Sequence, residues 1–176
     1  MAEHRSDIHG RVLELEDSSY TDGYGDGVEH SNVLDINPAN PAATIIADLA
    51  TADGIPSNQY DCFVLTQTLQ YVCDTGAAIH AHRILRQGGV LLIMLPAVSR
   101  VDPLLVDYWR FTAAFCASLL GDAFGAGSIS VRSYGNVLTA IAFLTGLAYE
   151  GPSKRELEAH DEYFPLIIAA RAVKQV

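Results

Sequence analysis

The segment R-V-L-E-L at residues 11–15 is a short apolar run that contains an acid, and E-D-S-S-Y at residues 16–20 follows it directly. A nucleotide-binding α/β protein has the pattern E-x-G-x-G-x-G here. Glycine lets backbone amides approach a ligand, and the following helix presents its positive N-terminus. Glu16, Ser18 and Tyr20 stand where these glycines are expected. The segment therefore predicts the first strand of an α/β sheet, followed by an altered binding loop.

Other apolar runs, flanked by turn residues, predict the rest of the sheet. They are continuous rather than alternating, which is typical of parallel strands that are covered on both faces. Near the end of the chain, alternating residues and then a final run indicate an added antiparallel pair at one edge. The predicted strands cover residues 31–34, 44–46, 62–66, 89–95, 129–132 and 166–173.

Capping residues and apolar stripes predict helices in the second half of the chain. The predicted helices are one that begins at Asp74 and ends before Gly88, one that follows Thr112 and buries Phe115, Leu119 and Leu120, one from Asn136 to about Tyr149, and a short one that begins at the capping-box pair Ser153 and Glu156.

The first half of the chain lacks such patterns. Residues 18–31 contain three glycines and no helical periodicity. Residues 37–43 contain Pro38 and Pro41, which exclude a helix of useful length. We therefore expect irregular loops in place of the first two crossover helices. With 176 residues, the chain is expected to form a single domain over residues 1–176.

Charge and composition restrict the partners. The net charge of −10 argues against a nucleic-acid backbone or an anionic membrane as the main partner. The apolar stretch 137–147 is too short to span a bilayer, and three cysteines without a pairing pattern indicate a reducing compartment. We expect a cytoplasmic protein. His80 and His82 lie two apart on a helix and cannot form a metal pair at positions i and i+4, so no metal site is predicted.

Five segments point together to one family. They are V-L-E-L at 12–15, N-V-L-D-I at 32–36, I-I-A-D-L at 45–49, Y-D-C-F-V-L-T-Q-T-L-Q-Y-V at 60–72 and R-I-L-R-Q-G-G-V-L-L-I at 83–93. In this order they resemble class I S-adenosylmethionine-dependent methyltransferases. The segment D-Y-W-R-F-T at 107–112 is similar to segments of methyltransferase-like proteins found with sugar and polysaccharide biosynthesis. The resemblance implies an α/β, Rossmann-like, seven-stranded and mostly parallel sheet with antiparallel edge strands and reduced helices in the first half.

The resemblance also implies S-adenosylmethionine as the cofactor and assigns its contacts by position. Glu14 would arrange the cofactor loop, and Asp35 would accept hydrogen bonds from both ribose hydroxyls. Asp48 and Leu49 would meet the adenine. A carboxylate suits the ribose, because it offers two acceptors for a vicinal diol. The alternative is that these acids are ordinary strand-end residues that cap loop amides.

Two further positions would meet the methionine portion of the cofactor. Thr66 and Gln67, at the end of the fourth strand, resemble residues that line this portion near the transferred methyl group. Glu16, at a glycine position, would repel the methionine carboxylate or favour the ammonium and sulfonium groups, depending on geometry.

The implied function is methyl transfer to a small acceptor, with a hydroxyl of a sugar or related metabolite as the expected group. Trp109 and Arg110 would form an acceptor-binding wall, with Asp107 as a base. Alternatively, Trp109 packs against the last helices and Arg110 pairs with a nearby acid. The rival function is a non-catalytic or repurposed methyltransferase-like domain that binds a partner, which the altered loop and the missing helices favour.

Residues 137–147 are apolar almost all round the expected helix. Such a helix either belongs to the core or covers a two-fold contact between copies, which would make the protein a homodimer.

Overall fold

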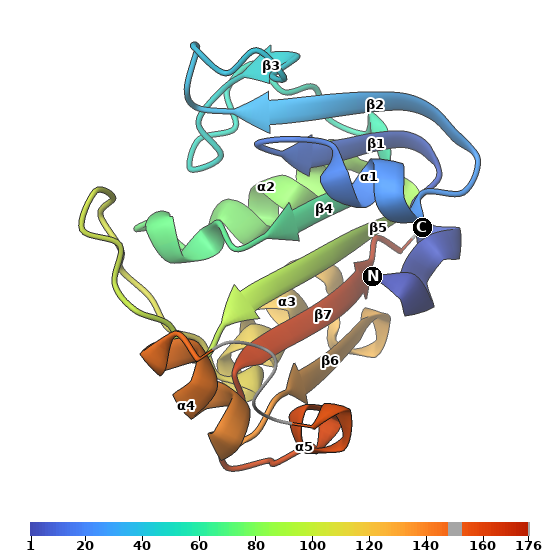
Figure 1. Cartoon of the computed structure of the whole chain (residues 1–176). Coiled ribbons are helices and arrows are strands. Elements are labelled where there is room, and N and C mark those ends of the chain that lie inside the picture. Colours follow the sequence, from blue (N-terminus) through green and yellow to red (C-terminus); the bar gives the residue numbers. More distant parts are fainter. Residues whose placement is uncertain (148–152, 176) are drawn as a thin grey trace.

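The computed structural model describes residues 1–147 and 153–175, and its strands form one sheet (Figure 1). The strands are β1 (Gly10–Leu15), β2 (Val28–Asp35), β3 (Ile45–Ile46), β4 (Tyr60–Thr66), β5 (Leu85–Pro96), β6 (Ile129–Tyr134) and β7 (Ile167–Val173). Their order in the sheet is β3-β2-β1-β4-β5-β7-β6. The first five strands pair in parallel, and β7 is antiparallel to both of its neighbours. The predicted fold class, with its antiparallel pair at one edge, is confirmed.

The two faces of the sheet are covered unequally. Successive strand residues point to opposite sides, so Phe63 and Leu65 of β4 face one way and Cys62 and Val64 face the other. The first pair belongs to the larger core, which helices α2 and α3 complete, whereas the second pair lies under a thinner cover from the N-terminal segment and α1. The face with the larger core carries α2 (Ala77–Ile84) and α3 (Ala113–Phe124). The opposite face carries α1 (Ser19–Tyr24) and the 3-10 helix η1 (Ala2–Asp7).

The first half contains little helix, as predicted. Helix α1 has six residues, fewer than two turns, and residues 37–43 form no helix. The loop after α1 is shorter than predicted, because β2 already begins at Val28.

Helix α2 differs from its prediction at both ends. Its N-cap is Gly76, and the Asp74 side chain instead accepts a hydrogen bond from the Gly76 amide at 2.8 Å. The helix ends at Ile84 because Leu85 already begins β5. Gly88 therefore does not end the helix: it adopts a left-handed φ of 77° inside β5. The prediction was wrong here because Leu85 fits both the apolar stripe of the helix and the apolar run of the strand.

Helix α3 begins as predicted, with the Thr112 hydroxyl accepting from the Phe115 amide. Its buried face was only partly predicted: Leu120 and Cys116 are buried, whereas Phe115 is exposed.

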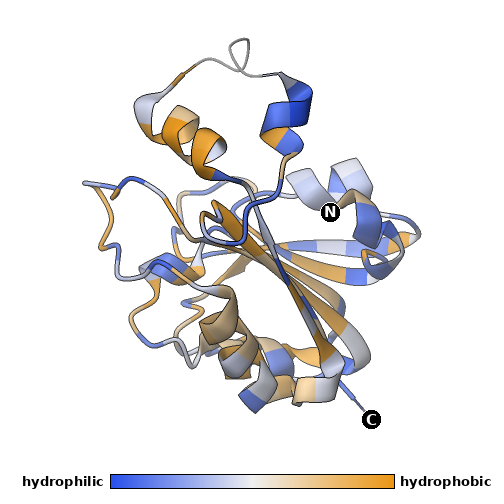
Figure 2. Ribbon diagram, turned by 90° about the horizontal axis from the view of Figure 1, so that it is seen from below, coloured by the Kyte–Doolittle hydropathy of each residue, from blue (hydrophilic) through white to orange (hydrophobic). Residues whose placement is uncertain are grey.

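Helix α4 (Val137–Thr145) begins at the capping box of Asn136 and Thr139 and ends at Gly146, and the predicted end near Tyr149 lies outside the described residues. Its buried side chains are the small ones, Ala140 and Ala142, so the core interpretation is wrong. Figure 2 shows α4 as an apolar helix at the periphery. The large apolar side chains exposed on it and just after it are Val137, Leu138, Ile141, Phe143, Leu144 and Leu147.

The remaining helices are short. Helix α5 (Lys154–Glu158) has the predicted capping box of Ser153 and Glu156, and η2 (Leu69–Tyr71) and η3 (Ala126–Ser128) are single 3-10 turns. Among the described residues, no helix combines the length and hydropathy that a membrane crossing requires.

Candidate functional site

A cavity of about 980 Å³ opens at the carboxyl edge of the parallel strands. Its walls come from the ends of β1 and β2, from the chain that follows β1, β2 and β3, from η2 and the residues beside it, and from residues 105–108. The strand order reverses between β1 and β4, and open α/β sheets bind ligands at such a switch point. The topology therefore makes this cavity the candidate site.

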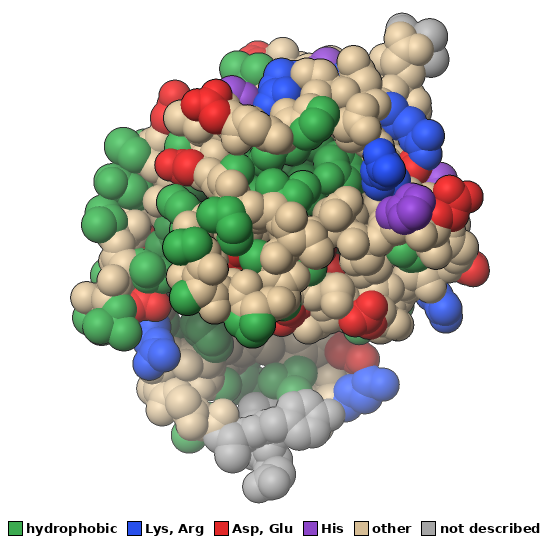
Figure 3. Space-filling model, turned by 90° about the horizontal axis from the view of Figure 1, so that it is seen from above, with side chains coloured by type: hydrophobic (Ala, Val, Ile, Leu, Met, Phe, Trp, Pro, Cys, Tyr) green, Lys and Arg blue, Asp and Glu red, His purple; other side chains and the backbone are tan. Residues whose placement is uncertain are grey.

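The charged side chains that line the cavity are acids. Glu16, Asp35 and Asp48 lie in its wall together with Leu49, and no described Lys, Arg or His lines it. On the face that Figure 3 shows, Lys and Arg side chains are scattered among acids rather than gathered into one patch. The cavity thus favours neutral or cationic groups over anionic ones.

Glu14 comes just before the lining residues Leu15 and Glu16 in sequence, and it holds helix α1 in place. It is 2% exposed, and its carboxylate accepts hydrogen bonds from the amides of Tyr20 and Thr21 at 2.9 and 2.8 Å and from the Thr21 hydroxyl at 2.6 Å. These amides belong to the first turn of the helix, where backbone donors lack intrahelical partners. Glu14 thus arranges the loop, and it does so by capping amides, as the alternative interpretation expected.

Asp35 is held at both carboxylate oxygens by the loop that follows it. Oδ1 accepts from the Asn37 amide at 2.8 Å, and Oδ2 accepts from Asn40 Nδ2 at 2.6 Å. The same Asn40 nitrogen donates to the carbonyl of Glu16 at 2.7 Å. One asparagine therefore connects the loops after β1 and β2.

Asp48 and Leu49 lie side by side in the cavity wall. The Asp48 side chain is exposed and accepts from the Ala50 amide at 2.8 Å, while Leu49 is almost fully buried. The pair offers a carboxylate beside an apolar surface, as an aromatic ring with an amino group would require.

Two residues without the freedom of glycine adopt left-handed backbone angles beside the switch point. Glu16 follows β1 with a φ of 65°, and Gln67 follows β4 with a φ of 49°. Such angles cost a residue with a side chain about 1–3 kcal/mol and often occur at ligand sites. Thr66 and Gln67 lie next to the cavity rather than in its wall, to which Thr68, just after β4, is the first contributor from this part of the chain.

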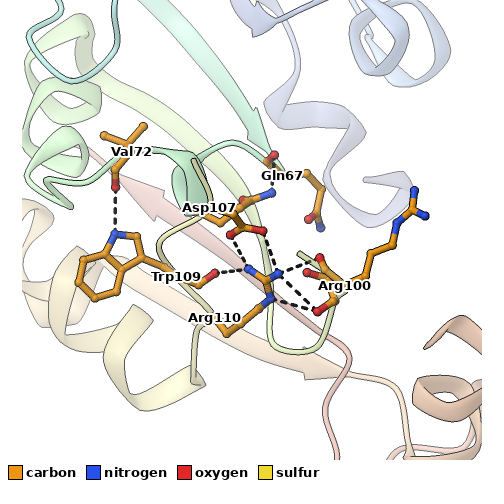
Figure 4. A network of polar contacts seen from close by, with 8 residues as sticks. Gln67, Val72, Arg100, Asp107, Trp109 and Arg110 are labelled. Carbon is orange, nitrogen blue, oxygen red and sulfur yellow. Dashed lines mark hydrogen bonds and ion pairs between the residues drawn. The ribbon is translucent and has the colours of Figure 1, made fainter. Parts of the chain in front are cut away.

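The side chains of Trp109 and Arg110 form hydrogen bonds with other residues of the chain (Figure 4). The indole Nε1 of Trp109 donates to the Val72 carbonyl at 3.0 Å. The guanidinium of Arg110 contacts both carboxylate oxygens of Asp107, at 2.6 and 2.9 Å, and donates to the Arg100 carbonyl. Neither residue lines the cavity, so the predicted wall of Trp109 and Arg110 is not part of it.

The pairing changes what Asp107 can do. The hydrogen bond from Arg110 lowers the pKa of the Asp107 carboxyl, and a carboxylate with a lowered pKa is a weak base. Tyr108, which lies between Asp107 and Arg110 in sequence, does line the cavity, together with Leu105 and Val106 from the same loop. Tyr71, from η2, lines it as well. Sequence reasoning missed Tyr71 and Tyr108 although both lie in the quoted motifs.

A second cavity, of about 400 Å³, lies between η1 and strands β5 to β7. Its arginines are already paired, Arg132 with Glu3 and Arg171 with Asp7. It lies on the face of the sheet rather than at the switch point, so it does not replace the larger cavity as the candidate site.

Neither the scan against family models nor the search of curated proteins finds a match. Solved structures, however, are similar over nearly the whole chain. A SAM-dependent methyltransferase from Archaeoglobus fulgidus matches with a TM-score of 0.62 at 12% identity, over 97% of this chain and 88% of that one. An S-adenosylmethionine-dependent methyltransferase from Mesorhizobium loti matches with a TM-score of 0.59 at 16% identity, over 95% and 92%. This chain has the class I methyltransferase fold.

The methyltransferase fold does not by itself decide the reaction. The [4+2]-cyclase SpnF matches this methyltransferase-fold chain with a TM-score of 0.58 at 13% identity, over 99% of this chain and 79% of the cyclase. At such identities the likeness extends to the fold alone. The function therefore depends on the residues of the cavity rather than on the fold.

Proposed function

We propose that this protein binds S-adenosylmethionine in the cavity at the carboxyl edge and transfers its methyl group to a small acceptor. The acceptor group is proposed to be a hydroxyl of a sugar or related metabolite. The observation that carries the proposal is that Asp35 and Asp48, which the family resemblance assigns to ribose and adenine, line one cavity at the switch point.

The carboxylate of Asp35 fits a ribose. Each of its oxygens accepts one hydrogen bond from the loop, and a carboxylate oxygen can accept two. One acceptor position therefore remains on each oxygen, which matches the two hydroxyls of a vicinal diol. Asp48 with Leu49 fits an amino-bearing aromatic ring in the same way, by a carboxylate next to an apolar surface.

When bound, the cofactor supplies a methyl group on a sulfonium that is already a good leaving group. The chain itself then has to align the acceptor and exclude water. Tyr71, Leu105, Val106 and Tyr108 form a wall with both apolar surface and hydroxyls, which suits the apolar and polar faces of a sugar ring. Asp107 is not assigned as the base, because Arg110 holds it.

Titration calorimetry tests the cofactor site directly. The wild type is expected to bind S-adenosylmethionine, and Asp35→Ala is expected to bind it about 10- to 150-fold more weakly, the usual range for hydrogen bonds to a charged group. Asp122→Ala is the matched control, since this exposed acid of α3 lies outside the cavity. Absence of binding by the wild type at millimolar cofactor would refute the proposal.

The acceptor needs a separate assay. Transfer of labelled methyl groups would be measured with a panel of neutral sugars and with their phosphorylated forms as anionic controls, which the acids of the cavity should disfavour. Binding of the cofactor without transfer to any sugar would refute the proposed acceptor.

A non-catalytic binding module is the second candidate. It is supported by Glu16 at a glycine position and by the engagement of Asp107 with Arg110. The same titration separates the two candidates, because a module that has lost the cofactor should bind neither S-adenosylmethionine nor its demethylated product.

A further inference from the structure

We propose that Asn40 is a positioning residue that makes the cavity selective for a ligand with two neighbouring hydroxyls. It would do so by fixing the carboxylate of Asp35, with which it shares a hydrogen bond. The inference rests on the proposed cofactor site and adds a residue that the sequence motifs did not single out.

All the polar groups of the Asn40 side chain are engaged. Its Nδ2 donates to Asp35 Oδ2 and to the Glu16 carbonyl, at 2.6 and 2.7 Å, and its Oδ1 accepts from the Ala42 amide at 2.9 Å. An amide nitrogen has two hydrogens, so both are used. The orientation of the amide is defined, because a reversed amide would place its oxygen against two acceptors.

The backbone around Asn40 adds stiffness. Pro38 and Pro41 flank it, and each proline fixes its own φ. The Asn40 amide also donates to the Asn37 carbonyl at 3.2 Å. The loop therefore presents the side chain in one arrangement before any ligand binds.

The consequence for Asp35 is that its carboxylate plane is set. Without Asn40, only the Asn37 amide would hold the side chain, at one oxygen, and the group could rotate. With Asn40, both oxygens are held on the loop side, and the remaining acceptor position of each is left for a ligand. A ligand with one hydroxyl would leave one of these positions without its partner, so a fixed carboxylate favours a diol.

Asn40 also supports the altered loop after β1. Glu16 has a left-handed φ of 65°. Its amide donates to the Leu34 carbonyl at 3.1 Å, and its carbonyl accepts from Asn40 Nδ2. Asn40 thus joins the residue that replaces a glycine to the acid that would receive the ribose.

The test compares binding of adenosine and 2′-deoxyadenosine by titration calorimetry. The wild type is expected to prefer adenosine at least about tenfold, and Asn40→Ala is expected to reduce the preference to less than about threefold. A merely structural role would weaken both ligands equally and leave the ratio unchanged, and that result would overturn the inference.

The controls separate this inference from the cofactor site itself. Asn32→Ala removes another hydrogen-bonded asparagine of β2, which contacts Thr44 and lies outside the cavity, and it should keep the wild-type ratio. If Asn40→Ala does not fold, Asn40→Ser keeps a small polar group that is too short to reach Asp35, and the same loss of preference is expected. A wild type that binds adenosine without preference would overturn both the ribose role of Asp35 and this inference. A preference retained in the Asn40 variants would overturn this inference alone.

Discussion

The carboxylate of Glu14 accepts hydrogen bonds from both the backbone amide and the hydroxyl of Thr21. In a glycine-rich site the first amides of the helix after β1 are available to a ligand. Here Glu14 accepts from the amides of Tyr20 and Thr21, and Asp17 accepts from the amide of Ser19. The methionine end of the proposed cofactor must therefore be held by other groups. The same hydrogen bonds to Glu14 thus anchor α1 and withdraw the loop amides from a ligand.

Replacement of Glu14 should therefore destabilise the protein. Glu14→Ala leaves three donors without an acceptor, two of them buried on Thr21, and we expect the free energy of unfolding to fall by about 2–4 kcal/mol in urea titrations. Thr21→Val removes only the hydroxyl donor and should cost about 1 kcal/mol. Equal losses in the two variants would contradict the anchoring role of Glu14.

The left-handed angle of Glu16 predicts a gain from glycine. Glu16→Gly relieves the strain, and after the entropic cost of a glycine we expect the free energy of unfolding to rise by about 0.5–1 kcal/mol. Glu16→Ala is the control, because it removes the carboxylate but keeps the Cβ that causes the strain. A similar change in both variants would assign the effect to charge rather than to backbone angle.

The ion pair of Asp7 with Arg171 predicts a dependence on pH. The hydrogen bond from Arg171 lowers the pKa of the Asp7 carboxyl, so the pair is fully stabilising above the unfolded pKa of about 3.9 and loses its contribution as the pH falls through the lower folded pKa. Asp7→Asn should cost about 1 kcal/mol at pH 6, and this cost should shrink as the pH falls through the lowered folded pKa of Asp7. Urea titrations at decreasing pH check it, with Glu3→Gln in the exposed pair to Arg132 expected to change little throughout.

The exposed surface of α4 favours association of two copies. Residues 133–147 contain no charged side chain, so two chains of net charge −10 can meet there without opposing like charges. We expect light scattering to report about twice the monomer mass of 19.0 kDa, and Phe143→Glu, at a position that is 53% exposed, to restore the monomer. A monomer mass for the wild type at all concentrations would contradict this expectation.

The sequence predicted the strands well because parallel strands are continuous apolar runs, as Cys62–Thr66 and Gly89–Leu95 illustrate. Helix ends were harder, since Leu85 fits either element. The exposure of α4 could not be predicted, because an apolar helix looks the same in sequence whether or not a neighbour covers it.

The site was predictable only where a residue ends a strand. Asp35 and Asp48 could be located from the strand pattern and the family resemblance, and they share one cavity. Asn40 could not, because its role depends on Glu16, which lies 24 residues away in sequence. Trp109 and Arg110 were predicted as a wall from the same motif in which Tyr108 lines the cavity. The motif does not reveal which side chain of an irregular loop points inward.

Strand β7 follows all the other strands in sequence, yet it lies between β5 and β6 in the sheet. Strand β6 pairs with β7 in the structure, and β5 has only β4 beside it until β7 arrives. A chain that is still being synthesised therefore carries a long, apolar strand with an open edge, which is the kind of surface on which aggregation begins. Folding without aggregation therefore depends on how soon β7 is available to pair with β5.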